Sequence, residues 1–484
     1  MSQLPSPVIL WFRRDLRLAD NAALSAAVEA GAPLIAIFIR EPYPTSAMPL
    51  GAAQAWWLHH SLTKLREDLR KRGADLMLAS GPAQDILGGI AQKVGASTIY
   101  FNRCYERDEM DREIAWELKQ QGVVVEAFHG QLLHDPSTVR TGAGRAFRVF
   151  TPFWKALQAL GEPREPIDAP KSLLGSAILP VSERLEDWEL LPRQPDWAAA
   201  FSDVWCPGEA GAHERLNDFI ESGLRDYKEG RDAPARDCTS RLSPHLTHGE
   251  ITPAQAWHAS RGLSGIDPAQ LADFRRELAW RDFNYSLLLA FPELATRNWN
   301  QSFDSFQWSF DAKQFRAWTK GLTGYPIVDA GMRQLWQEGY VHNRVRMIVA
   351  SFLIKDLMID WRKGEEWFRD TLVDADPANN AASWQWVAGS GADASPFFRI
   401  FNPILQGEKF DPDGDYVRRY VPQLAKLDRK YIHRPFDAPD AVLQKAGIVL
   451  GESYPKPMVD HAAARNRALS AYRSIGSRLQ EALR

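Results

Sequence analysis

Four clusters of polar side chains have the types and spacing that ligand binding or catalysis requires. The first is Thr239-Ser240-Arg241-Leu242-Ser243, which stands before Pro244 at a predicted helix start. Hydroxyls, an arginine and free backbone N–H groups at such a position can bind a phosphate or a pyrophosphate. An ordinary helix N-cap is the alternative for this cluster taken alone.

The second and third clusters lie on predicted helices. Glu277 and Arg281 are four residues apart, with Trp280 on nearly the same helix face. A surface ion pair is the alternative to a binding site there. The third cluster, HNRVRM at 342–347, opens a helix whose remainder is apolar enough to be buried. Polar groups at the head of a buried helix can line a pocket or a phosphate site, although a capped core helix with solvated arginines would also fit.

The fourth cluster combines carboxylates with tryptophans. Asp374 and Asp376 form a DxD pair, which Asn380, Trp384 and Trp386 follow. Two carboxylates could bind a divalent metal, but the pair has no companion ligand set, and aspartates are also common in turns. The chain contains no GxSxG, HExxH, Walker A or protein-kinase signature. Hydrolase and phosphoryl-transfer functions therefore have no motif to support them.

Residues 1 to about 130 alternate short apolar runs with helical patterns, which predicts strands and helices in alternation. Such strands predict a parallel sheet covered on both faces, with ligands at the carboxyl ends of its strands. The first strand runs into WFRRDLRL and no GxGxxG follows it, which disfavours a dinucleotide fold of the NAD type. The predicted strands are Pro7–Phe12, Pro33–Ile39, Asp75–Ser80, Ser97–Asn102 and Val123–Phe128, and the predicted helices are Asn21–Ala30, Ala52–Arg72, Ala83–Val94 and Asp108–Gln121.

The rest of the chain changes character. Residues 131–205 are richer in proline and turn residues, which predicts a connector between domains. From residue 206 to residue 484 the strand signals disappear, which predicts an all-helical domain. Its clearest helical segments are Ala269–Leu289, Lys313–Gly321, Ile327–Glu338 and Arg344–Trp361.

Composition narrows the classes of function. The 484 residues carry 58 Lys+Arg against 61 Asp+Glu, a formal net charge of −3. That balance excludes a broadly polycationic nucleic-acid binder but allows a local basic face. Three scattered cysteines offer no disulfide framework, and no apolar run approaches the length of a membrane span, so we expect a cytoplasmic protein without membrane association. The 18 tryptophans are unusual, because each needs an apolar pocket and a partner for its N–H.

Taken together, the clusters resemble the photolyase/cryptochrome family, flavoproteins that use blue light to repair DNA or to signal. The resemblance covers nearly the whole chain, and its motifs occur in the family's order. These motifs are WFRRDLRL (11–18), TSRLSP (239–244), ELAWRDF (277–283), TGYPIVDAGMRQL (323–335), HNRVRMIVASFLIKDLMIDWR (342–362), DADPANNAASWQW (374–386) and FRIFNP (398–403).

The resemblance implies an α/β parallel-sheet antenna domain at 1–130, a connector at 131–205 and an all-helical FAD-binding catalytic domain at 206–484. It replaces the metal interpretation of the DxD pair with a flavin site. Asn380 would face flavin N5, where an amide can donate or accept a hydrogen bond as the flavin changes protonation state. The implied FAD-binding residues are Tyr227, Thr239, Ser240, Arg241, Leu242, Ser243, Arg281, Arg346, Asp374, Asp376 and Asn380.

The same resemblance implies a pocket for a flipped-out pyrimidine dimer in UV-damaged DNA. The aromatic faces of Trp280 and Trp386 would receive the two pyrimidine rings. Glu277 would hydrogen-bond the thymine edge and stabilise the lesion radical anion. The implied lesion- and DNA-binding residues are Arg231, Glu277, Trp280, Asn343, Arg344, Met347, Trp386 and Gln406.

Three tryptophans match the family's electron-transfer chain. Trp384 would lie nearest the flavin, Trp361 would follow it, and Trp308 would lie near the surface. Closely spaced indoles provide stepwise oxidation sites through which an excited flavin can be reduced from outside. Core packing is the alternative for any single tryptophan.

Within the family, Asn343 favours repair of cyclobutane pyrimidine dimers. Enzymes for the (6-4) lesion tend to carry histidine at that position, because their chemistry needs an imidazole acid. The chain also stops about 80 residues after FRIFNP, without the low-complexity tail that signalling cryptochromes often carry. We therefore expect a light-driven dimer-repair enzyme, a carbon–carbon lyase, with a photoreceptor cryptochrome as the alternative. We expect a monomer with no obligate protein partner.

An antenna chromophore is also implied. Asp108 and Glu109 suggest 5,10-methenyltetrahydrofolate, and Trp56-Trp57 could offer it a stacking face. Ser46 lies where a folate-contacting histidine would be expected, which leaves 8-hydroxy-5-deazaflavin or a second flavin as alternatives.

Overall fold

The computed structural model describes residues 6–42, 49–394 and 398–482. The chain divides into two compact units, and two of the crossings between them fall near residues 222 and 289. Unit 1 comprises residues 1–147, 151–222 and 240–289, and unit 2 comprises residues 148–150, 223–239 and 290–484. The domain boundaries at 130 and 205 stay a prediction from the sequence.

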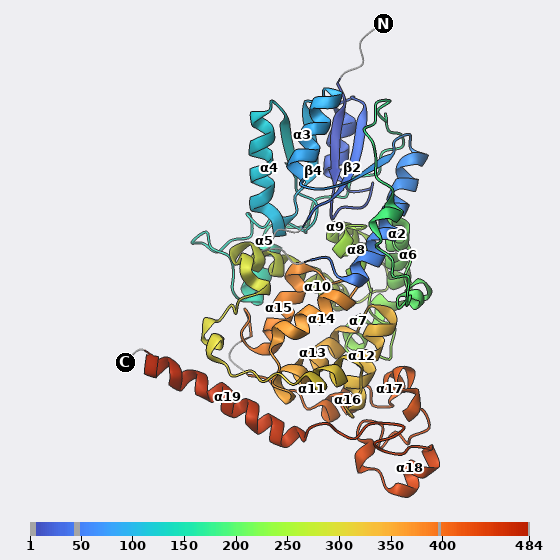
Figure 1. The fold of residues 1–484 in the computed structure, drawn as a ribbon, viewed down its shortest axis with the longest axis vertical. Helices are drawn as coiled ribbons and strands as arrows, with labels where there is room; N and C mark the ends of the chain where they lie inside the picture. The colour runs from blue at the N-terminus through green and yellow to red at the C-terminus, as the bar shows by residue number, and fades with distance from the viewer. Residues whose placement is uncertain (1–5, 43–48, 395–397, 483–484) are drawn as a thin grey trace. The chain divides into compact units, whose positions relative to one another are not determined.

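Unit 1 contains a five-stranded parallel sheet with the strand order β3-β2-β1-β4-β5 (Figure 1). The central strand β1 pairs on one side with β2, in the register Val8 to Leu34, and on the other with β4, in the register Ile9 to Ile99. All five residues of β1 are buried because helices cover both faces of the sheet. The parallel sheet predicted from the sequence is confirmed, with β1 at Val8–Phe12, β2 at Leu34–Arg40, β3 at Leu76–Ser80, β4 at Thr98–Asn102 and β5 at Val124–Phe128.

Alternate side chains of β1 enter two separate cores. Leu10 and Phe12 belong to the core on one face of the sheet, and Ile9 and Trp11 belong to the core on the other. The four helices predicted between the strands are confirmed to within two residues at each end. They are α1 at Ala22–Glu29, α2 at Ala52–Lys71, α3 at Ala83–Val94 and α4 at Asp108–Gln120.

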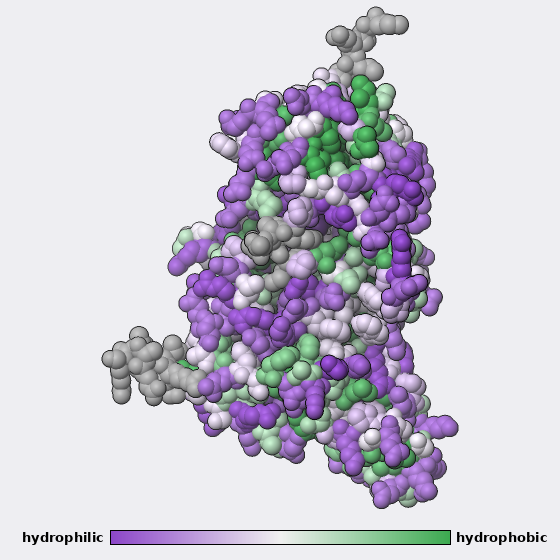
Figure 2. Space-filling view, in the orientation of Figure 1, coloured by the Kyte–Doolittle hydropathy of each residue, from purple (hydrophilic) through white to green (hydrophobic). Residues whose placement is uncertain are grey.

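The predicted connector contains one α-helix, α5 at Phe150–Ala159, and two short 3-10 turns. Unit 1 is completed by helices that carry two of the predicted site clusters. These helices are α6 at Glu209–Asp218, α8 at Ser243–His248, α9 at Pro253–Ala259 and α10 at Pro268–Ala290. The outer face of α4 presents mostly hydrophilic residues in Figure 2.

Unit 2 is helical throughout its described residues, apart from turns and one isolated bridge. Helices α12 and α13 pack around a large apolar core that also encloses Trp318, Trp361 and Trp384. The helical fold predicted for this part of the chain is confirmed. Its α-helices are α7 at Tyr227–Gly230, α11 at Ala312–Thr319, α12 at Pro326–Glu338, α13 at Asn343–Ser351, α14 at Trp361–Thr371, α15 at Pro377–Ala388, α16 at Pro403–Phe410, α17 at Asp415–Tyr420, α18 at Asp440–Ala446 and α19 at His461–Ala482.

The prediction of a single helix from Arg344 to Trp361 is wrong. Helix α13 ends at Ser351, a π-helical turn continues to Asp356, and Met358 adopts a left-handed φ of 57°. Asp360 then caps α14 by accepting a hydrogen bond from the backbone N–H of Arg362 at 3.0 Å. Trp361 therefore begins a new helix. Among the described residues, no helix is both long enough and apolar enough to cross a membrane.

Candidate functional site

The predicted site residues fall into two groups, one in each unit. The group in unit 1 lies on the loop before α8 and on α10, and the group in unit 2 lies on α7, α13, α15, α16 and the neighbouring loops. Unit 1 holds Ser240, Arg241, Leu242, Ser243, Glu277, Trp280 and Arg281, and unit 2 holds Tyr227, Arg231, Thr239, Asn343, Arg344, Arg346, Met347, Asp374, Asp376, Asn380, Trp386 and Gln406.

The hydroxyl-rich loop leads into α8, as predicted, but α8 has only six residues and its N-cap, Leu242, makes no side-chain capping bond. The side chain of Leu242 therefore gives no support to the ordinary N-cap interpretation. A helix this short has a weak dipole, so binding of an anion would depend on the loop's own groups. Arg241 adopts a left-handed φ of 50°, which non-glycine residues rarely do, and its guanidinium lies 4.6 Å from the ring centre of Trp205.

The second cluster places a buried cation on α10. Arg281 is 7% exposed, donates a hydrogen bond to the carbonyl of Leu246 at 3.2 Å, and lies over the ring of Tyr285. Arg281 is therefore a buried group rather than an exposed one on the surface of α10. Its neighbour Asp282 is also buried, and burial raises the pKa of Asp282 to about 7, although two backbone N–H groups bind the carboxylate.

The N-terminal end of α13 in unit 2 carries two ion pairs, whose carboxylates differ in burial. Arg344 pairs with Asp232 at 2.7 Å and lies 4.4 Å from the ring centre of Phe410. Arg346 pairs at 2.8 Å with Asp374, whose side chain is only 2% exposed. Both arginines are thus held by carboxylates rather than solvated, which excludes a capped core helix with free arginines at this position.

The remaining side chains at this end of α13 are positioned as follows. His342 caps the helix through its Nδ1, which accepts a hydrogen bond from the backbone N–H of Arg344 at 3.2 Å. Burial lowers the pKa of His342 to about 4, so the imidazole is neutral near pH 7. Met347 accepts a weak hydrogen bond from Arg344 through its sulfur at 3.8 Å, and Asn343 is exposed.

Helix α15 begins with the fourth cluster. Asp376 is its N-cap, and the Asp376 carboxylate accepts hydrogen bonds from the backbone N–H groups of the next turn. No group of three or more His, Cys, Asp or Glu side chains in the described part of the chain could hold a metal ion. The amide nitrogen of Asn380 donates to the buried Glu365 carboxylate at 2.9 Å. The Asn380 amide is therefore oriented, with its oxygen left as a hydrogen-bond acceptor.

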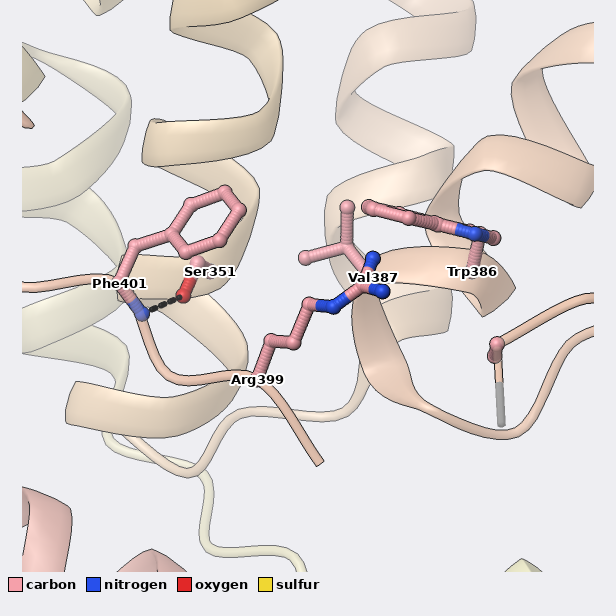
Figure 3. Close-up of a pocket in the computed structure, with 6 residues that line it drawn as sticks. Ser351, Trp386, Val387, Arg399 and Phe401 are labelled. Carbon is pink, nitrogen blue, oxygen red and sulfur yellow. Dashed lines mark hydrogen bonds between the residues drawn. The ribbon is translucent and has the colours of Figure 1, made fainter. Parts of the chain in front are cut away.

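A small hollow lies beside α15 in unit 2 (Figure 3). The guanidinium of Arg399 lies 5.0 Å from the ring centre of Trp386, and Figure 3 shows both side chains at the same hollow. The backbone N–H of Phe401 donates to the Ser351 hydroxyl at 3.1 Å, which ties the segment carrying Arg399 to α13. The lining residues are Ser351, Trp386, Val387, Ala394, Arg399 and Phe401.

Two of the three tryptophans predicted to form the electron-transfer chain lie in the core of unit 2. Trp384 is packed against α14 at Gly364, where an added Cβ would meet the indole at 2.1 Å. Trp361 begins α14, is 0% exposed and donates its indole N–H to Asn298 at 2.9 Å. Trp308 is only partly buried, and its ring lies 4.3 Å from that of Phe306.

The residues predicted for the antenna lie at the start of α4. Asp108 pairs with Arg103 at 2.7 Å and with Arg112 at 3.1 Å, and Glu109 is exposed. Trp56 and Trp57 do not offer the expected stacking face, because they are 5% and 0% exposed and pack against other rings. Ser46 lies outside the described residues.

Several residues that position the site were not singled out from the sequence. Asp232 holds Arg344 from a segment 112 residues earlier, and Glu365 orients Asn380 from the neighbouring helix. Arg399 and Gly364 are the other two. Arg399 could have been found, since it stands inside the FRIFNP motif. The other three contact the site only through the tertiary fold, and no local pattern marks them.

Comparison with known proteins agrees with this architecture. Residues 8–171 match the model of the DNA photolyase family, and residues 274–474 match the FAD-binding domain of DNA photolyase. A protein named deoxyribodipyrimidine photo-lyase from Agrobacterium fabrum is 61% identical over 98% of this chain and 99% of its own length. The chain belongs to the photolyase/cryptochrome family.

Two further relatives refine its place in that family. The crystal structure of a class III photolyase from Agrobacterium tumefaciens superposes with a TM-score of 0.96 at 60% identity, covering 99% of both chains. Cryptochrome-1 of Arabidopsis thaliana is 37% identical over 96% of this chain but 70% of its own length. The photolyase relatives are thus similar to this chain over their whole length, and the resemblance of the motifs to this family is confirmed.

Proposed function

We propose that the protein is a light-dependent enzyme that splits cyclobutane pyrimidine dimers in DNA. The observation that carries this proposal is the contact between an indole face and a guanidinium beside α15, where Arg399 lies 5.0 Å from the ring centre of Trp386. Aromatic faces receive unstacked bases, and arginines bind the adjoining phosphates. The 61% identity to a named deoxyribodipyrimidine photo-lyase over 98% of the chain supports the same activity.

FAD is the cofactor we propose, from residues considered in each unit by itself. In unit 1, the loop at 240–243 has hydroxyls and the strained Arg241 that suit the phosphates and ribitol, and the buried Arg281 suits the isoalloxazine. In unit 2, Tyr227 and Thr239 suit the phosphates and ribitol, and the Arg346–Asp374 ion pair suits the isoalloxazine. When bound, FAD supplies the light-driven electron transfer that the protein's own side chains cannot perform.

Asn380 and Asp376 have separate tasks in this proposal. The hydrogen bond from its nitrogen to Glu365 orients the Asn380 amide, whose oxygen would accept a hydrogen bond from a protonated flavin nitrogen. Asp376 caps α15 and so fixes the start of the helix on which Asn380 stands. Burial raises the pKa of Glu365, so its carboxyl holds a proton more readily than an exposed glutamate.

For the lesion, we propose indole faces and a carboxylate as binding groups, taken in each unit by itself. Trp280 in unit 1 and Trp386 in unit 2 each offer an indole face to a pyrimidine ring, and Glu277 in unit 1 would hydrogen-bond a thymine edge and stabilise the charge that develops there. Arg344 is already oriented by Asp232 at 2.7 Å, which lowers the entropy lost when it binds a phosphate. The remaining residues in this role are Arg231, Asn343, Met347 and Gln406.

The tryptophans 384, 361 and 308 provide oxidation sites between the flavin and solvent. Two features support this role: Trp384 and Trp361 belong to the packed helices α15 and α14, and Trp308 is partly exposed. The chain of indoles would let an outside electron donor keep FAD reduced.

An assay of repair in light tests the proposal against the photoreceptor alternative. Chemically reduced protein is illuminated with an oligonucleotide that carries a dimer, and the recovery of absorbance at the thymine band is followed against a dark control. We expect the number of dimers repaired to exceed the number of protein molecules many times over. Flavin photoreduction without any recovery would instead establish a photoreceptor.

For the antenna we propose 5,10-methenyltetrahydrofolate, with Asp108 and Glu109 at the start of α4 among its contacts. The support is the exposed carboxylate of Glu109 next to the ion-paired Asp108. An absorption spectrum of the purified protein separates a near-ultraviolet folate band from the blue band of a deazaflavin or a second flavin. We also propose that the protein acts on DNA as a monomer, which gel filtration tests.

A further inference from the structure

Glu250 is a fully buried carboxylate in unit 1, two residues beyond the end of α8. Its Oε1 accepts hydrogen bonds from the indole N–H of Trp57 at 3.0 Å and from the backbone N–H of Gly208 at 2.7 Å. Its Oε2 accepts one from Nδ1 of His245 at 2.5 Å. A buried carboxylate is costly unless it is bonded in this way, so Glu250 is a fixed point between α2, the turn before α6 and α8.

The bonds to Glu250 also fix the ring of Trp205. Trp205 is 5% exposed and lies three residues before Gly208, whose N–H is one of the groups bound to the carboxylate. The ring of Trp205 packs edge-on against that of Trp57, with 5.5 Å between their centres. Glu250 therefore holds both the ring beside Trp205 and the backbone just after it.

The ring of Trp205 in turn supports the predicted phosphate loop. The guanidinium of Arg241 lies 4.6 Å from the Trp205 ring centre, within the range of a cation–π contact. Arg241 also has a φ of 50°. A left-handed conformation is unfavourable for a non-glycine residue and persists only where the surrounding structure imposes it. The stack on Trp205 is a contact that can impose it.

We propose that Glu250 is a positioning residue for FAD binding, which acts through Trp57, Gly208 and Trp205 to hold Arg241 in the conformation that binds the cofactor's phosphates. The proposal rests on the assignment of the loop at 240–243 to the FAD phosphates. Glu250 itself needs no contact with FAD.

The test is the rate at which FAD leaves the holoprotein, followed by the rise in flavin fluorescence at a temperature well below unfolding. Glu250→Ala should raise this rate about tenfold. This is the lower end of the loss of affinity seen when a residue that orients a ligand-binding side chain is removed. Glu250→Gln keeps an oxygen that can accept from Trp57 and Gly208, and it should stay within about threefold of the wild type. Asp111→Ala is the matched control, since Asp111 is 5% exposed, lies in the same unit and is paired with Arg13. That variant should lose stability without a change in FAD release.

A double-mutant cycle separates positioning from a general loosening of the unit. If Glu250 acts through Arg241, then Glu250→Ala should add less than about twofold to the FAD release rate of Arg241→Ala. A tenfold effect that persists in the Arg241→Ala background would overturn the proposal. If Arg241→Ala alone leaves FAD release unchanged, the assignment of the phosphate loop fails instead.

Glu250→Ala leaves three buried donors without an acceptor, so a milder variant accompanies it. Trp57→Phe removes the indole N–H and keeps most of the ring. It should raise the rate of FAD release severalfold. In the Arg241→Ala background, Trp57→Phe should add little to that rate, as predicted for Glu250→Ala. Unchanged FAD release in Trp57→Phe would exclude the route through Trp57 and Trp205.

Discussion

The contact between Gly364 and Trp384 is the tightest point on the predicted electron path. A Cβ added at Gly364 would lie 2.1 Å from Cη2 and 2.3 Å from Cζ3 of Trp384, and 2.7 Å from Cδ2 of Leu353. Carbon atoms in contact are separated by about 3.5–4.0 Å, so Gly364→Ala requires the indole to move by about 1.4 Å. Trp384 is 2% exposed, and the displaced ring has no open space to enter.

Two opposing effects set the size of the change in stability. Alanine gains about 1 kcal/mol over glycine inside a helix, and overpacking of a core costs about 1–3 kcal/mol. Because a rigid indole and a leucine are both displaced, we expect Gly364→Ala to lower the free energy of unfolding by about 1–2 kcal/mol. Gly89→Ala is the matched control, since Gly89 stands inside α3 with nothing within 4 Å of the added Cβ. It should raise the free energy of unfolding by about 0.5–1 kcal/mol.

Urea unfolding of the two variants measures this difference, and the rate of flavin photoreduction under blue light reports on Trp384. We expect slower photoreduction in Gly364→Ala and the wild-type rate in Gly89→Ala. If Gly364→Ala is stabilised as much as Gly89→Ala and reduces its flavin at the wild-type rate, then the packing of Trp384 against α14 is not as described.

Three further predictions concern the lesion, the electron path and a buried lysine. Glu277→Ala should leave FAD bound but lower the yield of dimer repair, and an unchanged yield would remove Glu277 from the mechanism. Trp308→Phe should block light-driven reduction of oxidised flavin while sparing repair by chemically reduced protein, whereas Trp116→Phe, at a 64% exposed position on α4, should alter neither. Burial lowers the pKa of Lys355 well below its usual 10.5, so the unfolded chain binds a proton at this side chain more tightly than the folded protein does. Folding is therefore opposed at pH 7 and less so as the pH rises toward 10.5. Lys355→Met should raise the free energy of unfolding by about 1 kcal/mol at pH 7 and by less at pH 9, as measured by urea unfolding, and an equal change at both pH values would contradict this.

Local patterns predicted the elements of unit 1 well, for an identifiable reason. Strands such as β1 are buried on both faces and read as unbroken apolar runs, while α2 and α4 show helical periodicity. The order β3-β2-β1-β4-β5 was not predicted, because strand order depends on how the crossovers pack and not on any one segment.

The break between α13 and α14 shows where periodicity fails. Apolar residues occupy 352–354 and resume at 357–359, after Lys355 and Asp356, so the pattern gives no sign that the helix ends. The signal that could have been used is Asp360, an N-cap residue directly before Trp361. Met358, with its positive φ, is a residue type that rarely marks a turn.

The candidate site was predictable where motifs fix the residue types and unpredictable where the tertiary fold supplies the partner. Arg344 and Arg346 were found from the sequence, but their carboxylate partners lie 112 and 28 residues away along the chain. Trp57 was expected to stack on an antenna, whereas the fold buries its ring and binds its N–H to Glu250. Long-range pairings of this kind leave no local pattern in the sequence.

The central claim is that this chain, with reduced FAD, repairs dimers in DNA when it is illuminated. The most direct measurement counts the thymine dimers split per bound FAD, by chromatography of an oligonucleotide that carries one dimer per strand. Chemically reduced protein should split many dimers per FAD in blue light and none in the dark. A count in light that does not exceed the dark control, from protein shown to hold reduced FAD and to bind the oligonucleotide, would contradict the claim.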